Sequence, residues 1–149
     1  MSSKRDDNTR KTAVDANNNW SSYGVGIGHV GSYQVSGRPW ITGSTSMVAN
    51  TEDKIEFPSV TKQVVVINHA SQTLRIHFAP GAQGNTLDGE HYIELDSDED
   101  SFTFNVKCKE IYLSTPSSNS AVAKYRVYAE LTSIPTLRMY ALTGSGITE

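Results

Sequence analysis

The sequence has only one cysteine, Cys108, among its 149 residues. One cysteine cannot form an intrachain disulfide, so we expect no disulfide framework, and this usage fits a chain made in a reducing compartment. No apolar run comes near 18 residues, which predicts that no transmembrane helix is present. Residues 1–11 lack the apolar stretch of a secretory signal, so no such signal is expected.

Basic residues are also scarce. Thirteen Lys and Arg stand against sixteen Asp and Glu, and the resulting charge of −3 provides no basic field to attract nucleic acid. Hydrophobic residues (37%) and charged residues (19%) are both few, and Ser, Thr, Asn and Gly take their place. This composition favours short strands and turns over helices.

Signals for catalysis and cofactor binding are missing as well. The run GVGIG at residues 24–28 has the wrong spacing for a dinucleotide-binding loop, and no helix pattern follows it. No GxSxG motif is present, and no two of the four histidines have the spacing of a helical zinc site (His29, His69, His77 and His91). The sequence therefore predicts a protein that is not an enzyme and that uses no cofactor or metal.

The sequence contains one dense acidic run, residues 96–100. Asp96, Asp98 and Asp100 resemble the start of a calcium-binding loop, but Ser101 and Lys107 stand where such a loop has glycine and glutamate. We expect a solvated hairpin loop here, and cation binding by the three aspartates stays open.

What the chain does have is a series of β-strand patterns. In Thr73–Phe78 we expect Leu74, Ile76 and Phe78 to point inward and Arg75 and His77 outward. Other strands are expected at Trp40–Val48, Lys54–Phe57, Lys62–Asn68, Glu90–Asp96, Ser101–Lys107 (with Phe102, Phe104 and Val106 on one face), around Ile111 and Leu113, and at Ala121–Leu131. Roughly eight strands at this spacing predict an all-β fold, an antiparallel β-sandwich of jelly-roll-like or Ig-like topology, in a domain of residues 38–149 with a short C-terminal tail.

The first part of the chain, residues 1–37, is predicted to be an extended and partly disordered N-terminal arm. It is rich in glycine and polar residues and cannot build a core alone, but it can lie along a neighbouring molecule by strand addition. Aromatic and β-branched residues would anchor such an interface, and the candidate partner-binding residues are Trp20, Tyr23, Val25, Ile27, Tyr33, Val35 and Trp40. The alternative is that the aromatic residues fold back over their own domain. Exchange of arms would favour a homo-oligomer, a dimer or trimer.

Three segments carry a resemblance to a known class of proteins. They are Gly28–Ser44 (GHVGSYQVSGRPWITGS), His91–Ser114 (HYIELDSDEDSFTFNVKCKEIYLS) and Met139–Glu149 (MYALTGSGITE). Together they resemble small virion structural proteins of tailed bacteriophages, particularly those of cyanophages. The resemblance implies a non-enzymatic decoration or cement protein in the virion, on the capsid surface, that is assembled in the host cytoplasm. Its implied partner is the major capsid protein, with no nucleic acid or membrane involved.

Two alternatives remain at this point. One is a structural protein of the tail or of the head–tail junction. The other is a glycan-binding β-sandwich that mediates adhesion. It would need exposed aromatic residues along one face or in a cluster of loops, and Tyr92, Tyr112 and Tyr128 are the candidates on strands.

Overall fold

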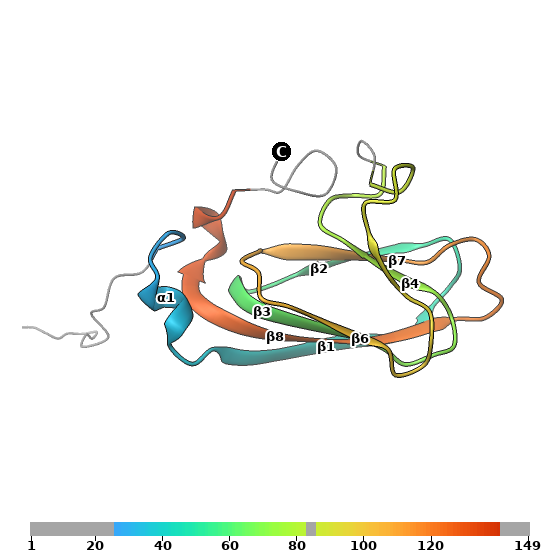
Figure 1. The fold of residues 1–149 in the computed structure, drawn as a ribbon, viewed down its shortest axis with the longest axis horizontal. Helices are drawn as coiled ribbons and strands as arrows, with labels where there is room; N and C mark the ends of the chain where they lie inside the picture. The colour runs from blue at the N-terminus through green and yellow to red at the C-terminus, as the bar shows by residue number, and fades with distance from the viewer. Residues whose placement is uncertain (1–25, 83–85, 141–149) are drawn as a thin grey trace, which may run out of the picture. The chain divides into compact units, whose positions relative to one another are not determined.

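A computed structural model describes residues 26–82 and 86–140 (Figure 1). The chain divides into two compact units between Val35 and Ser36. Most of the expected arm, residues 1–25, lies outside the described residues, as does the C-terminal segment 141–149.

The described part of the first unit contains one helical turn, α1 (Gly31–Gln34), so the expected extended conformation is wrong for these four residues. Local hydrogen bonds explain the difference. The amide of Tyr33 donates to the carbonyl of Val30 (3.0 Å), and the Tyr33 hydroxyl donates to the carbonyl of Ile27 (2.7 Å). The segment therefore satisfies backbone groups within itself, where an extended conformation would need a neighbouring strand.

The second unit is an antiparallel β-sandwich, which confirms the predicted fold class. Sheet A has the strand order β1-β8-β3-β6, and sheet B has the order β2-β7-β4-β5. The strands are β1 (Arg38–Met47), β2 (Glu52–Glu56), β3 (Ser59–Asn68), β4 (Leu74–His77), β5 (Ile93–Leu95), β6 (Ser101–Phe104), β7 (Glu110–Ser114) and β8 (Ala123–Pro135), and a short 3₁₀ helix, η2 (Thr136–Arg138), follows β8. In Figure 1 the two sheets appear as two layers of roughly aligned strands.

The strands pair in a nested order. β4 pairs with β5, β3 with β6, β2 with β7 and β1 with β8, so the first half of the chain runs antiparallel to the second half. The paired halves are distributed over both sheets, and this is the jelly-roll arrangement. Of the two topologies that the sequence leaves open, the strand order is that of the jelly roll.

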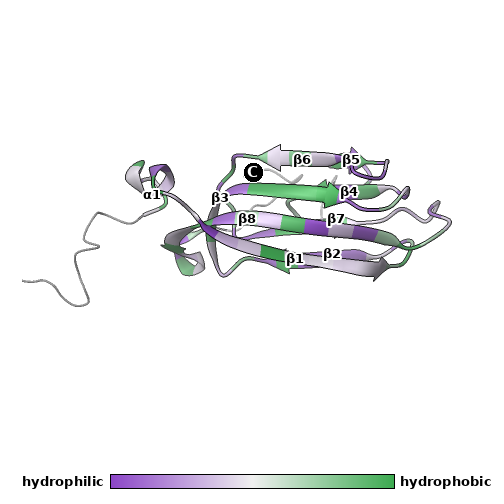
Figure 2. Cartoon of the chain, turned by 90° about the horizontal axis from the view of Figure 1, so that it is seen from below, coloured by the Kyte–Doolittle hydropathy of each residue, from purple (hydrophilic) through white to green (hydrophobic). Residues whose placement is uncertain are grey.

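Alternation along β8 builds one side of the core. Tyr125, Val127, Ala129 and Leu131 are buried, whereas Lys124 and Arg126 are exposed, as their period of two predicts. Residues from both sheets complete the core: Met47, Ile55, Phe57, Val64, Val66, Leu74, Ile76, Leu95, Phe104, Cys108, Ile111, Leu113 and Ala123. Figure 2 shows a hydrophobic stretch in the second half of β3, while the second half of β1 is of intermediate hydropathy.

Two expectations about individual side chains need correction. His77, expected to point to solvent, is fully buried: the Tyr112 ring stacks on its ring, and the Ala79 carbonyl, in the chain that follows β4, accepts a hydrogen bond from it. Phe102, expected inside with Phe104, is 41% exposed because β6 is the last strand of sheet A and has no neighbour beyond it. The Phe102 ring still lies 4.9 Å from the ring of Phe104.

Among the described residues, no helix has the length and apolar character needed to span a membrane.

Candidate functional site

The outer face of sheet A is partly apolar. Ile41 of β1, Tyr128 of β8 and Val65 of β3 follow one another in register across the face, and Thr103 of β6 completes the row. Ile41 is 67% exposed, and Tyr128 and Val65 are half-buried. Because side chains alternate along each strand, this row lies on the side of the sheet opposite the core.

Charged residues are few on this face. Lys124, Arg126 and Glu130 lie on β8, and Lys62 lies at the bulge of β3 between Thr61 and Gln63. The other outward residues of the described parts of β1, β3 and β6 are uncharged (Pro39, Ile41, Gly43, Thr45, Gln63, Val65, Ile67, Ser101 and Thr103). Apolar surface of this kind, bordered by polar residues, is typical of protein contact sites.

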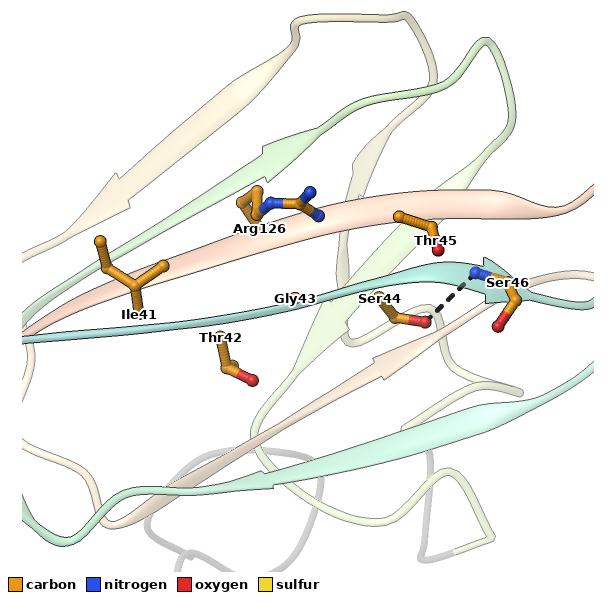
Figure 3. Close-up of a pocket in the computed structure, with 7 residues that line it drawn as sticks. All are labelled: Ile41, Thr42, Gly43, Ser44, Thr45, Ser46 and Arg126. Carbon is orange, nitrogen blue, oxygen red and sulfur yellow. Dashed lines mark hydrogen bonds between the residues drawn. The ribbon is translucent and has the colours of Figure 1, made fainter.

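At the edge of this face lies a shallow groove along β1. It is lined by residues 41–46 and by Arg126 of the neighbouring strand β8. Figure 3 shows Ile41, Thr45 and Arg126 on one side of the strand and Thr42 on the other. The Arg126 guanidinium donates a hydrogen bond to the carbonyl of Tyr125 (2.9 Å), which holds its side chain close to the sheet.

Gly43 makes room for Arg126. A Cβ atom at this position would lie 2.6 Å from the Tyr125 carbonyl oxygen and 2.8 Å from Nη1 of Arg126. These contacts are shorter than a side chain tolerates, so the absence of a side chain at Gly43 allows Arg126 to lie beside β1.

The outer face of sheet B differs, because its charges are paired with one another. Arg75 of β4 lies 3.3 Å from the carboxylate of Glu94 on β5, and Lys54 of β2 lies 3.4 Å from Glu110 on β7. The Tyr112 hydroxyl donates to Glu110 Oε2 (3.1 Å), and the Tyr112 ring stacks on the ring of His77 at 5.9 Å. The polar groups of this face thus already have partners within the sheet.

A serine–histidine pair, of the kind that can act in nucleophilic catalysis, lies within sheet B. His77 Nε2 is 2.9 Å from Ser114 Oγ, and Nδ1 is 2.7 Å from the carbonyl oxygen of Ala79. A carbonyl only accepts, so Nδ1 carries the proton and Nε2 accepts from the serine hydroxyl. Glu52 Oε1 lies 3.8 Å from the same Nε2 atom.

Burial argues against catalysis by this pair. His77 is 0% exposed and Ser114 is 3% exposed, so a substrate cannot reach the serine oxygen without displacing the fold. Desolvation by burial lowers the pKa of His77, which keeps the ring neutral. The pair therefore satisfies buried polar groups and supports the structure.

The acidic run 96–100 forms the turn between β5 and β6. The structure brings Asp98 and Glu99 near His69, with one ligand atom from each residue within 4.8 Å of the others. Asp100 is engaged differently, because its carboxylate accepts a hydrogen bond from the Ser97 amide (3.1 Å). The three aspartates of the run therefore do not converge on one point, and Asp98 and Glu99 are exposed to water.

The predicted partner-binding residues fall into three groups. Trp20, Tyr23 and Val25 lie outside the described residues. Ile27, Tyr33 and Val35 belong to the first unit, around α1. Trp40 is on β1, where it packs against the core with its ring 5.3 Å from the ring of Phe57 in an edge-on arrangement.

The three tyrosines considered for glycan stacking are not exposed together. Tyr112 is buried, Tyr92 lies beneath the Arg75 guanidinium at 4.6 Å, and Tyr128 is on the opposite sheet. These three tyrosines therefore do not form one exposed face in the described structure.

The groove residues Ile41, Gly43 and Arg126 were not among the predicted binding residues. Their signal in the sequence is alternation: once Trp40 is placed on the core, Ile41 must point to solvent, and Arg126 must do so between the inward residues Tyr125 and Val127.

Comparisons with known proteins add no relative. No protein-family model, no curated protein and no solved structure matches this chain.

Proposed function

We propose that this chain is a non-enzymatic structural protein of a bacteriophage particle, which binds the capsid exterior and stabilises contacts between major capsid subunits. Two lines of argument support the proposal. The first is the resemblance of three sequence segments to virion structural proteins of tailed phages. The second is the jelly-roll topology, an architecture that recurs in viral capsid and lectin domains and that by itself implies no single function.

The observation that carries the proposal is the contrast between the two outer faces of the sandwich. Sheet B pairs its charges internally, through Arg75–Glu94 and Lys54–Glu110. Sheet A leaves the row Ile41, Tyr128 and Val65 at its surface. A binding protein needs such a face, because burying apolar area is the main driving force of association.

Weak contacts would suffice on a capsid. A lattice presents the same site many times, and an arm that binds a neighbouring subunit adds a second attachment to each copy. In this proposal the outer face of sheet A contacts the shell, and residues before Ser36 provide the second attachment.

The test uses purified capsids that lack the protein and measures how many copies bind. Val65→Glu with Thr103→Glu adds two charges to the row, on β3 and on the edge strand β6, and we expect occupancy to fall at least about tenfold. The matched control, Ser117→Glu with Ser118→Glu, adds the same charge to the exposed loop between β7 and β8 and should bind like the unchanged protein. Equal occupancy for both variants would remove sheet A from the proposal.

The arm is tested separately by deleting residues 1–30. If it is a second attachment, the deletion weakens binding while the sandwich keeps its fold, which circular dichroism would verify. The number of copies per particle tests the position: a ratio near one copy per major capsid subunit supports the shell, whereas about six to twelve copies per particle would place the protein at the tail or connector.

A further inference from the structure

The described sandwich has four sheet edges, and they are not equally protected against pairing with another strand. Four of the five residues of β2 are charged, β5 has three residues and β6 has four. Short or charged edge strands are the usual means by which proteins prevent such pairing. β1 has neither property: it is ten residues long, and its single charged residue, Arg38, is the first.

Within the described sandwich, β1 has a strand partner, β8, on one side only. Its register with β8 is regular from Arg38 to Ser44 and is interrupted by a bulge before Met47. Pro39 lacks an amide hydrogen, which leaves Trp40–Ser44 as the regular stretch that can pair. Five residues in extended conformation span about 17 Å, the length of an ordinary paired strand.

Three of the five residues in this stretch have a small side chain or none. Thr42 and Ser44 are small, and Gly43 has no side chain. The groove along residues 41–46 follows the same stretch, with Arg126 on the β8 side (Figure 3).

We infer that the free edge of β1 pairs with the β1 strand of a second copy of this chain, antiparallel and about a two-fold axis, which joins the two A sheets into one eight-stranded sheet. Charge favours this partner. From Pro39 to Met47 the strand is uncharged, so pairing it with itself opposes no like charges. The same pairing through β2 would place its acidic residues against one another.

The symmetry also agrees with the side-chain pattern. A two-fold axis perpendicular to the sheet keeps Ile41 of both copies on the same outer face. The apolar rows Ile41, Tyr128 and Val65 then become one surface across the dimer. The dimer would therefore present twice the apolar area to the shell, which extends the proposed function. The edge strand β1 is the reason to expect the dimer, and dimerisation can be measured in the isolated protein.

The first experiment measures molecular mass by light scattering over a range of protein concentrations. We expect the full chain to approach twice its 16.3 kDa mass. Ile41→Lys with Thr45→Lys should remain monomeric, because lysines on an edge strand oppose its pairing with another strand and the four lysines of a dimer would lie along one seam. Ile41 and Thr45 are exposed, so this variant should keep its fold. The matched control, Ser101→Lys with Thr103→Lys on the short edge strand β6, should dimerise like the unchanged protein.

Two results would overturn the inference: an unchanged protein that stays monomeric up to about millimolar concentration, or a dimer that survives the two lysines on β1. A dimer lost equally in the β1 and β6 variants would also overturn it, since the interface would then be the face and not the edge.

Amide hydrogen exchange identifies the edge directly. Alternate amides of Trp40–Ser44 point away from β8, and we expect their exchange to slow about tenfold as the dimer forms, and to stay fast in the lysine variant. Unchanged exchange at these amides in a dimeric sample would place the interface elsewhere.

Capsid occupancy is a separate readout: a protein that dimerises through β1 but does not bind capsids would refute the proposed function and leave this inference intact.

Discussion

The hydroxyl of Tyr125 donates a hydrogen bond of 2.8 Å to Asp53 Oδ2, and this bond joins the two sheets because Tyr125 lies on β8 and Asp53 on β2. Burial of Tyr125 in the core, followed by its bond to the Asp53 carboxylate, raises the pKa of the phenol. The hydroxyl therefore stays protonated and remains a donor throughout the range in which the protein is handled.

Replacing Tyr125 by Phe should lower the free energy of unfolding by about 1–2 kcal/mol, because a buried hydrogen bond to a charged acceptor is lost. Urea denaturation measures the change. Tyr128→Phe is the matched control on the same strand, since its hydroxyl contacts Glu130 at 3.4 Å and it is only half-buried. The control should lose less than about 0.5 kcal/mol, and equal losses in the two variants would show that the bond between the sheets adds no stability.

The buried ring of His77 should make the stability depend on pH. Its pKa in the folded protein is lowered from 6.5 by desolvation, so below pH 6.5 the unfolded chain binds more protons than the folded one. The stability that comes from keeping His77 neutral is complete above the pKa of His77 in the unfolded chain. It is lost as the pH falls from that value to the lower pKa of His77 in the folded protein. In that window we expect the free energy of unfolding to decline by up to about 1.4 kcal/mol per pH unit.

Denaturation curves from about pH 8 to about pH 5 test this, with His77→Gln compared with the unchanged protein. The variant should be less stable at neutral pH and should show a flatter decline on acidification. His91→Gln, at an exposed position, should keep the steep decline. A decline of the same slope in His77→Gln would assign the acid sensitivity to other groups.

The strand pattern predicted the sandwich because it depends on a local property, the alternation of side chains. β8 is the best example: Tyr125, Val127 and Ala129 are buried, as their spacing requires. The burial of His77 could not be predicted in this way. Ser114, which pairs with it, is 37 residues away in sequence, and only the pairing of β4 with β7 brings the two together.

The candidate site shows the same limit. Alternation places Ile41 and Arg126 at outward positions of their strands, but it cannot predict that these two strands, β1 and β8, pair with each other. The nested pairing of the strands along the chain makes β1 and β6 the two edge strands of sheet A. The exposure of Phe102 has the same origin, since an inward position on a last strand is covered only in part.

Gly43→Ala should destabilise the fold although the position is exposed. The added methyl group would lie 2.6 Å from the Tyr125 carbonyl oxygen, a backbone atom of the central strand that cannot easily move. We expect a loss of about 1–3 kcal/mol in the free energy of unfolding, measured by thermal or urea denaturation. Gly28→Ala is the control, because a Cβ there meets no atom within 4 Å, and a comparable loss in that variant would contradict the steric explanation.

Cys108 should be unreactive in the folded protein and reactive in the unfolded one. The residue is 1% exposed, and burial raises the pKa of its thiol to about 11, while its sulfur lies 3.3 Å from Thr61 Oγ1. Near pH 8 the thiolate that attacks iodoacetamide is therefore rare and also inaccessible. Mass spectrometry should find the folded chain unmodified and the chain in concentrated urea modified once.

Ser118→Cys, on the exposed loop between β7 and β8, provides the control, since this variant should react once while folded and a second time only after unfolding. Labelling of Cys108 at the same rate with and without urea would mean that the core around Thr61 opens readily, contrary to the packing seen between β3 and the segment that follows β6.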